Sequence, residues 1–199
     1  MDQLSFVQHA VNKGNDLSSD LFAVYMDIAS RFQNYETTYK YFYEKTKEDV
    51  NSRNNSKGEH LLIEPIIIPS VSSALFTGMY GDFEYYLNLI CNAYKIKHNY
   101  KIDLKDISGN GIERAVSYLT KVVQVRDLKN TPEWSKLKHW NRIRNIIVHN
   151  NRVIRNQEDK VSIIFLNLNI NEKQNRVYLL IDDCKRFLNL ILNFFRICI

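Results

Sequence analysis

The segment Arg144-Asn-Ile-Ile-Val-His149 contains two residue types that together can act on a phosphodiester. An arginine stays positively charged and can hold two phosphate oxygens at once. A histidine, with an unperturbed pKa of about 6.5, can take up or release a proton near neutral pH. The histidine would move a proton at the ribose 2′-OH or the leaving oxygen, and the arginine would stabilise the negative charge of the transition state. This pair is a minimum set for cleaving RNA without a metal.

The spacing of the pair is weak evidence, because Arg53 and His60 form a comparable pair in the same chain. That second pair lies in a polar segment, Asn51 to Glu59, which is typical of a loop and offers nothing rigid to hold the side chains. The first pair follows a strongly signalled helix and has an asparagine directly after each partner, Asn145 and Asn150. We therefore expect chemistry at the first pair only.

Positive charge is concentrated around this pair. The chain has a formal net charge of +5, which alone favours nucleic acid only weakly. No acidic residue interrupts the following series: Lys136, Lys138, Arg142, Arg144, Arg152 and Arg155. Such a cluster would attract a phosphate backbone, and we expect RNA contacts from Lys138, Arg142, Asn150 and Arg152. A solvated helix face explains the same charges equally well at this stage.

A helix over about 132–149 must position the pair. Thr131-Pro-Glu is a clear helix start, with a cap, a proline in the first position and an acid in the first turn. At 100° per residue one polar stripe contains four side chains, those of Lys138, Arg142, Asn145 and His149. Arg144 falls instead on the apolar side.

An arginine on an apolar face is costly unless it is paired, and two explanations remain open. One is a buried ion pair with an acid such as Asp82 or Glu84; the other is a site where two copies of the helix meet. Arg144 and His149 lie about 140° apart around a helix, so one straight helix should not aim both at one phosphate. Either the helix breaks near Val148 or the site is assembled across two chains. We expect the two-chain site.

The segment Arg144-Asn-Ile-Ile-Val-His149 resembles the Arg-x4–6-His motif of HEPN-superfamily domains, including the frequent polar residue after the arginine. The upstream Gly109-Asn-Gly-Ile-Glu-Arg-Ala-Val-Ser-Tyr-Leu119 is similar to stretches in bacterial abortive-infection-like members. The resemblance covers about Ser70 to Ile199. It implies a helical bundle that forms a homodimer, with two motifs in one composite, metal-independent ribonuclease site.

By this resemblance Arg144 and His149 are catalytic residues and Asn145 supports them. The family implies an endoribonuclease that leaves 2′,3′-cyclic phosphate ends, needs no cofactor, and acts as a toxin or anti-phage effector. An antitoxin or sensor protein is a possible partner. Some members are inactive, so the alternative is a non-catalytic module that binds RNA or a partner protein.

The remaining patterns predict a single all-α domain over 1–199, a bundle of about five main helices. Long helices are predicted over about 17–50, capped by Ser18 or Ser19, and from Ser70 onward. A third follows the turn at Gly111, and the last covers about Ile181 to Phe195. A small β-hairpin over about 161–179, with arms Val161–Leu166 and Arg176–Leu179, should precede the last helix. Leu61–Ile68 should be an extended connector that plugs the core.

Other chemistry has little support in the sequence. The cysteines, Cys91, Cys184 and Cys198, have no metal-ligand spacing and are expected to be buried in a reducing cytoplasm. Neighbouring acids at Asp182-Asp183 are expected to offset a helix dipole rather than to bind metal. No signal peptide or membrane-spanning stretch is recognisable, so we expect a cytoplasmic protein without a membrane partner.

Overall fold

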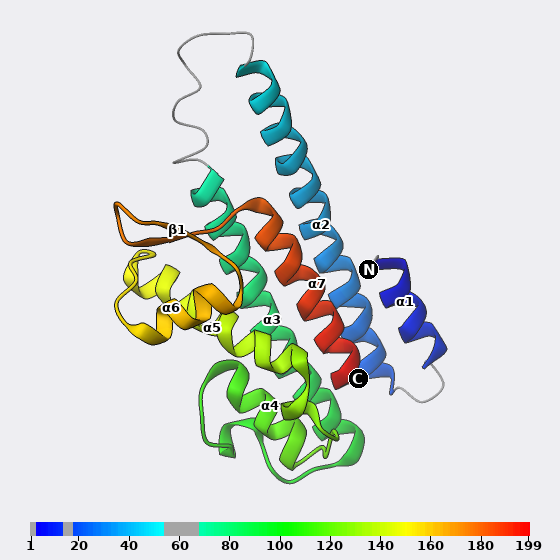
Figure 1. Cartoon of the computed structure of the whole chain (residues 1–199). Coiled ribbons are helices and arrows are strands. Elements are labelled where there is room, and N and C mark those ends of the chain that lie inside the picture. The colour runs from blue at the N-terminus through cyan, green and yellow to red at the C-terminus, as the bar shows by residue number, and fades with distance from the viewer. Residues whose placement is uncertain (1–2, 14–17, 54–67) are drawn as a thin grey trace. The chain divides into compact units, whose positions relative to one another are not determined.

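The computed structural model describes residues 3–13, 18–53 and 68–199, which are mainly helical (Figure 1). In chain order the elements are α1 (Gln3–Asn12), α2 (Ser19–Arg53), α3 (Ile68–His98), η3 (Leu104–Asp106), α4 (Gly111–Lys121), η4 (Leu128–Asn130), α5 (Pro132–Asn150), α6 (Gln157–Phe165), β1 (Asn169–Asn171), β2 (Arg176–Tyr178) and α7 (Ile181–Cys198). The all-α class with a hairpin before the C-terminal helix is confirmed. No helix in this described part has the length and apolar character needed to cross a bilayer.

The chain divides into two compact units. Unit 1 comprises Met1–Gln33, Tyr80–Ser135 and Asn189–Ile199, and unit 2 comprises Asn34–Met79 and Lys136–Leu188. The long helices α2, α3, α5 and α7 therefore each contribute residues to both units. The segment Arg144–His149 lies in unit 2.

Aromatic side chains form the core of each unit. In unit 1, Phe83 packs against Phe195 with ring centroids 5.3 Å apart, and Phe6 stacks on Tyr25 at 4.2 Å. In unit 2, three helices each contribute one ring to a fully buried cluster, with centroids 4.8–5.3 Å apart: Phe76 of α3, Trp140 of α5 and Phe187 of α7. This cluster fixes the inward face of α5, and with it the direction of the polar face.

Two predicted helix starts are confirmed by their hydrogen bonds, whereas α3 begins at Ile68, ahead of the predicted Ser70. The Ser18 hydroxyl accepts from the amide of Leu21 at the start of α2, at 3.4 Å. The Thr131 hydroxyl accepts from the amide of Trp134 at 3.1 Å, with Pro132 as the first residue of α5. A side-chain oxygen at this position satisfies an amide that has no partner within the helix.

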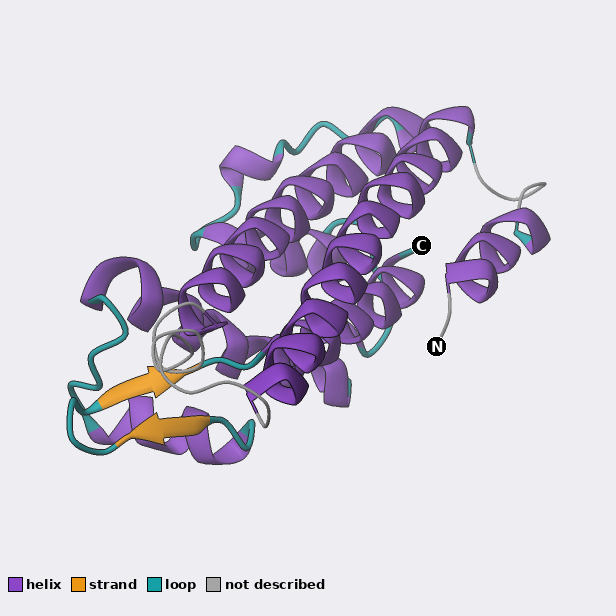
Figure 2. Ribbon diagram, turned by 90° about the horizontal axis from the view of Figure 1, so that it is seen from above, coloured by secondary structure: helices purple, strands orange, loops and turns teal. Residues whose placement is uncertain are grey.

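The first arm of the predicted hairpin is wrong. Residues Val161–Leu166 were expected in a strand, but most of them form the C-terminal part of α6. The observed strands, β1 and β2, pair antiparallel with Ile170 opposite Val177 (Figure 2). Only the second arm, Arg176–Leu179, was located correctly. The predicted connector Leu61–Ile68 lies outside the described residues except for Ile68, which begins α3.

Candidate active site on helix α5

Helix α5 is continuous through the segment Arg144–His149. Its inward face consists of side chains that are at most 5 % exposed: Trp134, Leu137, Trp140, Ile143 and Ile146. Because Ile143 and Ile146 are held in the core, the intervening Arg144 and Asn145 are half-buried at its edge. His149 and Val148 are exposed. The alternative of a helix break near Val148 is therefore wrong.

The side chains of Arg144 and His149 meet within one chain. Nη1 of Arg144 lies 3.1 Å from Nε2 of His149 and also donates to Oδ1 of Asn145 at 3.1 Å. Both groups are therefore within reach of each other on one continuous helix, which removes the angular argument that one straight helix should not aim both at one phosphate. A 140° separation describes the Cα–Cβ directions, whereas the long, flexible arginine side chain carries its guanidinium around the helix surface.

The contact has one possible donor. A guanidinium can only donate hydrogen bonds, so Nε2 of His149 is the acceptor in this contact. A general base needs a nitrogen with an available lone pair, and Nε2 is the nitrogen that faces Arg144.

The buried-ion-pair explanation named two acids as partners for Arg144. Asp82 forms an ion pair with Arg31, at 2.6 Å between Nε and Oδ2. Arg144 is half-buried, so the burial of its charge costs less than its place on the apolar side suggested.

Behind His149 the chain turns sharply. Asn151 and Arg152 have positive φ values of 48° and 67°, and the amide of Arg152 donates to the carbonyl of Ile146 at 2.9 Å. The carbonyl of Arg152 then accepts from Val177 of β2 at 2.9 Å. The hairpin is thus attached to the chain directly after α5 and holds the end that carries His149.

The residues predicted to bind RNA fall into two groups. Lys138 is exposed on α5, and Asn150 and Arg152 are half-buried near its C-terminal end. Arg142, by contrast, donates from Nε to Oδ1 of the buried Asp159 at 2.6 Å. Its guanidinium is engaged within the protein, so less of its charge is available to a phosphate than the sequence suggested.

Sequence analysis missed helix α6 and its role in the site. Asn156 caps this helix by accepting from the amide of Asp159 at 2.9 Å, and the same oxygen accepts from Nη2 of Arg142 at 3.0 Å. The pattern of an asparagine followed three residues later by an acid is a helix-start signal, and it could have revealed α6. In Figure 1, α6 lies alongside α5.

His139 was also missed. Its Nδ1 lies 3.1 Å from the hydroxyl of Ser162, and its ring stacks on Phe165 with centroids 4.1 Å apart. Burial, followed by the positive charge of Lys138, lowers the pKa of His139. Burial thus disfavours the charged form, and His139 couples α5 to α6 through its contact with Ser162 and its stacking on Phe165.

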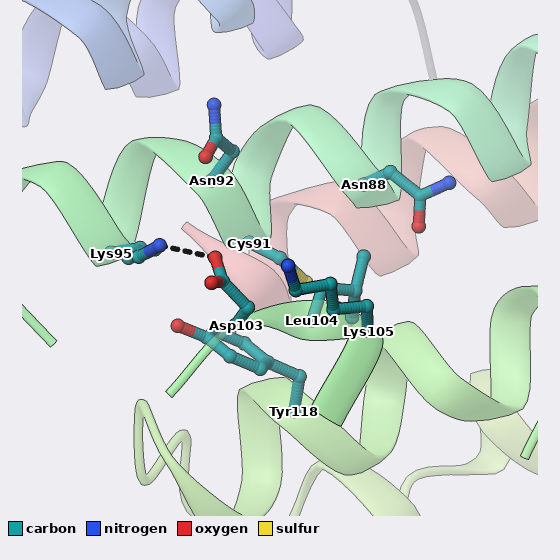
Figure 3. A pocket seen from close by; sticks show the side chains of 8 residues that line it. All are labelled: Asn88, Cys91, Asn92, Lys95, Asp103, Leu104, Lys105 and Tyr118. Atoms are coloured by element: carbon teal, nitrogen blue, oxygen red, sulfur yellow. Dashed lines mark hydrogen bonds and ion pairs between the residues drawn. The ribbon is translucent and has the colours of Figure 1, made fainter. Parts of the chain in front are cut away.

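A separate pocket of about 290 Å³ lies in unit 1 (Figure 3). Its lining residues are Asn88, Cys91, Asn92, Lys95, Asp103, Leu104, Lys105 and Tyr118. Lys95 and Asp103 form an ion pair, and the hydrogen bond from Lys95 lowers the pKa of Asp103. The hydroxyl of Tyr118 donates to the carbonyl of Ile102 at 3.0 Å. These contacts hold the η3 segment in place, so we interpret the pocket as structural.

Within the described ranges, no group of three or more histidine, cysteine, aspartate or glutamate side chains is arranged to hold a metal ion. The chain matches no family model, no curated protein and no solved structure. The resemblance to HEPN domains therefore rests on the sequence segments alone, and the function must be argued from the geometry on α5.

Proposed function

We propose that this protein is a metal-independent endoribonuclease whose catalytic residues are Arg144 and His149, with Asn145 in support. The observation that carries the proposal is the 3.1 Å approach of the Arg144 guanidinium to Nε2 of the exposed His149. One charged group able to hold a phosphate and one imidazole able to move a proton are thereby adjacent on a continuous helix.

The proposed reaction begins when a phosphate of RNA draws the guanidinium of Arg144 away from His149. Nε2 of His149 is then free to take the proton of the ribose 2′-OH. The 2′ oxygen attacks the phosphorus and the bond to the 5′ oxygen breaks. The leaving oxygen takes a proton from solvent water, and His149 then returns the proton it took to the resulting hydroxide. The products are a 2′,3′-cyclic phosphate and a 5′-hydroxyl end. Arg144 stabilises the charge that develops on the phosphate oxygens.

The biological setting is proposed from the resemblance to HEPN domains. By that resemblance the protein is a cytoplasmic toxin or anti-phage effector and forms a homodimer. An antitoxin or sensor protein would keep it inactive. The geometric reason for a two-chain site no longer holds, because both groups meet within one chain. Dimerisation is therefore proposed on the family resemblance alone.

The test is cleavage of total bacterial RNA by the purified full chain in the presence of EDTA. Wild-type protein should produce fragments with 2′,3′-cyclic phosphate ends, and Arg144→Ala or His149→Ala should each lower the rate by at least about 10²-fold. His98→Ala and Arg126→Ala are matched controls, since both residues are exposed elsewhere on the chain. Normal cleavage by both active-site variants would show that the site is assigned wrongly.

Expression in bacteria provides the second arm of the test. We expect growth arrest with RNA fragmentation for the wild type and normal growth for His149→Ala. RNA binding without cleavage at any protein concentration would contradict the enzyme and support the non-catalytic RNA-binding module.

A further inference from the structure

Phe165, the last residue of α6, combines exposure with a fixed orientation. Its side chain is 52 % exposed, yet its ring stacks on His139 with an interplanar angle of 26° and centroids 4.1 Å apart. A ring stacked on one side and open to solvent presents a flat aromatic surface. Proteins that bind single-stranded nucleic acid use such surfaces to stack bases.

The support beneath this ring is rigid. His139 lies on α5, and its Nδ1 is 3.1 Å from the hydroxyl of Ser162, which is only 5 % exposed. One turn further along α5, Arg142 is bonded to the buried Asp159 of α6. The orientation of Phe165 is therefore set before any ligand binds, and less entropy is lost on binding.

The surroundings of the ring suit a nucleic-acid strand. Val161 and Ile164 on the same helix are 49 % and 72 % exposed and extend the apolar surface beside Phe165. The exposed Lys138 directly precedes His139 on α5, so a cation lies close to the platform. An aromatic surface beside a cation favours a base with its attached phosphate over an uncharged protein surface.

We propose that Phe165, supported by His139, is a stacking platform for one unpaired base of an RNA strand that lies along α5. This inference rests on the proposed function and adds that the substrate is single-stranded where it crosses the platform. His139 and His149 are ten residues apart, about 15 Å along the helix axis. The stacked base would therefore belong to a nucleotide near the reacting phosphate but not to the reacting nucleotide itself.

The test measures binding without cleavage. The probe is a short mixed-sequence RNA carrying 2′-O-methyl groups throughout, which lacks the hydroxyl nucleophile. We expect Phe165→Ala to raise the Kd by about 5- to 150-fold, the usual cost of losing one stacked base, and Phe165→Trp to bind like wild type. Tyr85→Ala is the matched control, because it removes a ring that is 56 % exposed on α3 rather than on α6.

Two further measurements distinguish stacking from a structural effect. The fluorescence of 2-aminopurine placed in the probe should be quenched by wild type and by Phe165→Trp, but not by Phe165→Ala. A blunt duplex of the same sequence should bind wild type and Phe165→Ala equally, because its bases are not available for stacking. Equal affinity of wild type and Phe165→Ala for the single strand would overturn the platform and leave the proposed nuclease intact.

The remaining outcomes are equally decisive. A second outcome is that Phe165→Ala loses affinity for the single strand while wild type never cleaves unmodified RNA. That outcome would support the stacking platform and refute the proposed nuclease activity. If Phe165→Ala converted a dimer into a monomer without changing RNA affinity, the exposed face of α6 would be a contact between copies of this chain. That result would overturn the platform.

Discussion

The guanidinium of Arg142 lies 2.6 Å from the carboxylate of Asp159, joining α5 to α6 beside the proposed active site. The Asp159 side chain is 2 % exposed, whereas that of Arg142 is 34 % exposed. Asp159 also accepts from the amide of Arg155 at 2.9 Å. The pair is therefore asymmetric, because water can solvate the arginine more readily than the aspartate.

This asymmetry predicts how much stability is lost when Arg142 is removed. Arg142→Ala leaves a buried carboxylate without its cation and should lower the free energy of unfolding by about 2–3 kcal/mol. That value is below the full cost of breaking a buried pair, because part of Arg142 is in water. Urea denaturation provides the measurement. The exposed Lys136 supplies the control, and Lys136→Ala should change stability by less than about 0.5 kcal/mol.

The same asymmetry predicts that Lys138 and Arg142, two residues of the polar stripe, contribute differently to RNA binding. Lys138 is exposed, so Lys138→Gln should weaken RNA binding and lower the slope of log K against log salt by about 1. Arg142→Gln should change this slope less, because its charge is already paired with Asp159. Titrations at several salt concentrations, under conditions where both variants are folded, check the comparison. Equal slopes for the two variants would contradict it.

The sequence was informative where the signals were local. The start of α5 at Thr131-Pro132 and its inward-facing Leu137 and Trp140 were predictable from capping chemistry and helical periodicity. Helix α6 was misassigned because its β-branched and aromatic residues resemble a strand. Its helical state is favoured by the Asn156 cap and by the ion pair of Asp159 with Arg142, seventeen residues away.

The site itself shows the limit of helical-wheel reasoning. Angles around a helix suggested that Arg144 and His149 should not face one phosphate, yet their nitrogens are 3.1 Å apart. The error arose because an arginine has several rotatable bonds beyond Cβ, and their conformations depend on neighbours such as Asn145. The identity of the residues was predictable, and the path of the side chain was not.

The cysteines should be unreactive in the folded protein. All three are at most 1 % exposed, and burial raises the pKa of the Cys91 thiol to about 12. Burial also raises the pKa of Cys184 and of Cys198. Because the thiolate is the nucleophile, a disulfide reagent at pH 8 should react slowly with native protein and rapidly with all three thiols in denaturant. Rapid reaction of a native thiol would show that its site opens.

Two glycines of α3 should respond differently to alanine. A Cβ on Gly81 would meet no atom within 4 Å, so Gly81→Ala should stabilise the protein by about 0.5–1 kcal/mol through helix propensity. A Cβ on Gly78 would lie 3.2 Å from the hydroxyl of Tyr35 on α2, which is tighter than an ordinary van der Waals contact. Gly78→Ala should therefore gain less. Thermal unfolding of both variants measures the difference, and equal gains would show that Tyr35 moves without cost.

Asn145 should act by positioning Arg144. Its side-chain oxygen accepts from the same Nη1 atom that faces His149, so it fixes where the guanidinium rests. In Asn145→Ala the arginine keeps its charge and loses this restraint. We expect kcat for RNA cleavage to fall by about tenfold with KM nearly unchanged, because fewer encounters place the guanidinium correctly.

Asn145→Ser, which retains a hydroxyl acceptor, should recover part of the rate. Thermal unfolding of both variants should match wild type, since Asn145 is half-buried at the edge of the core. A rise in KM at constant kcat would contradict the positioning role and would instead make Asn145 a direct contact for the RNA.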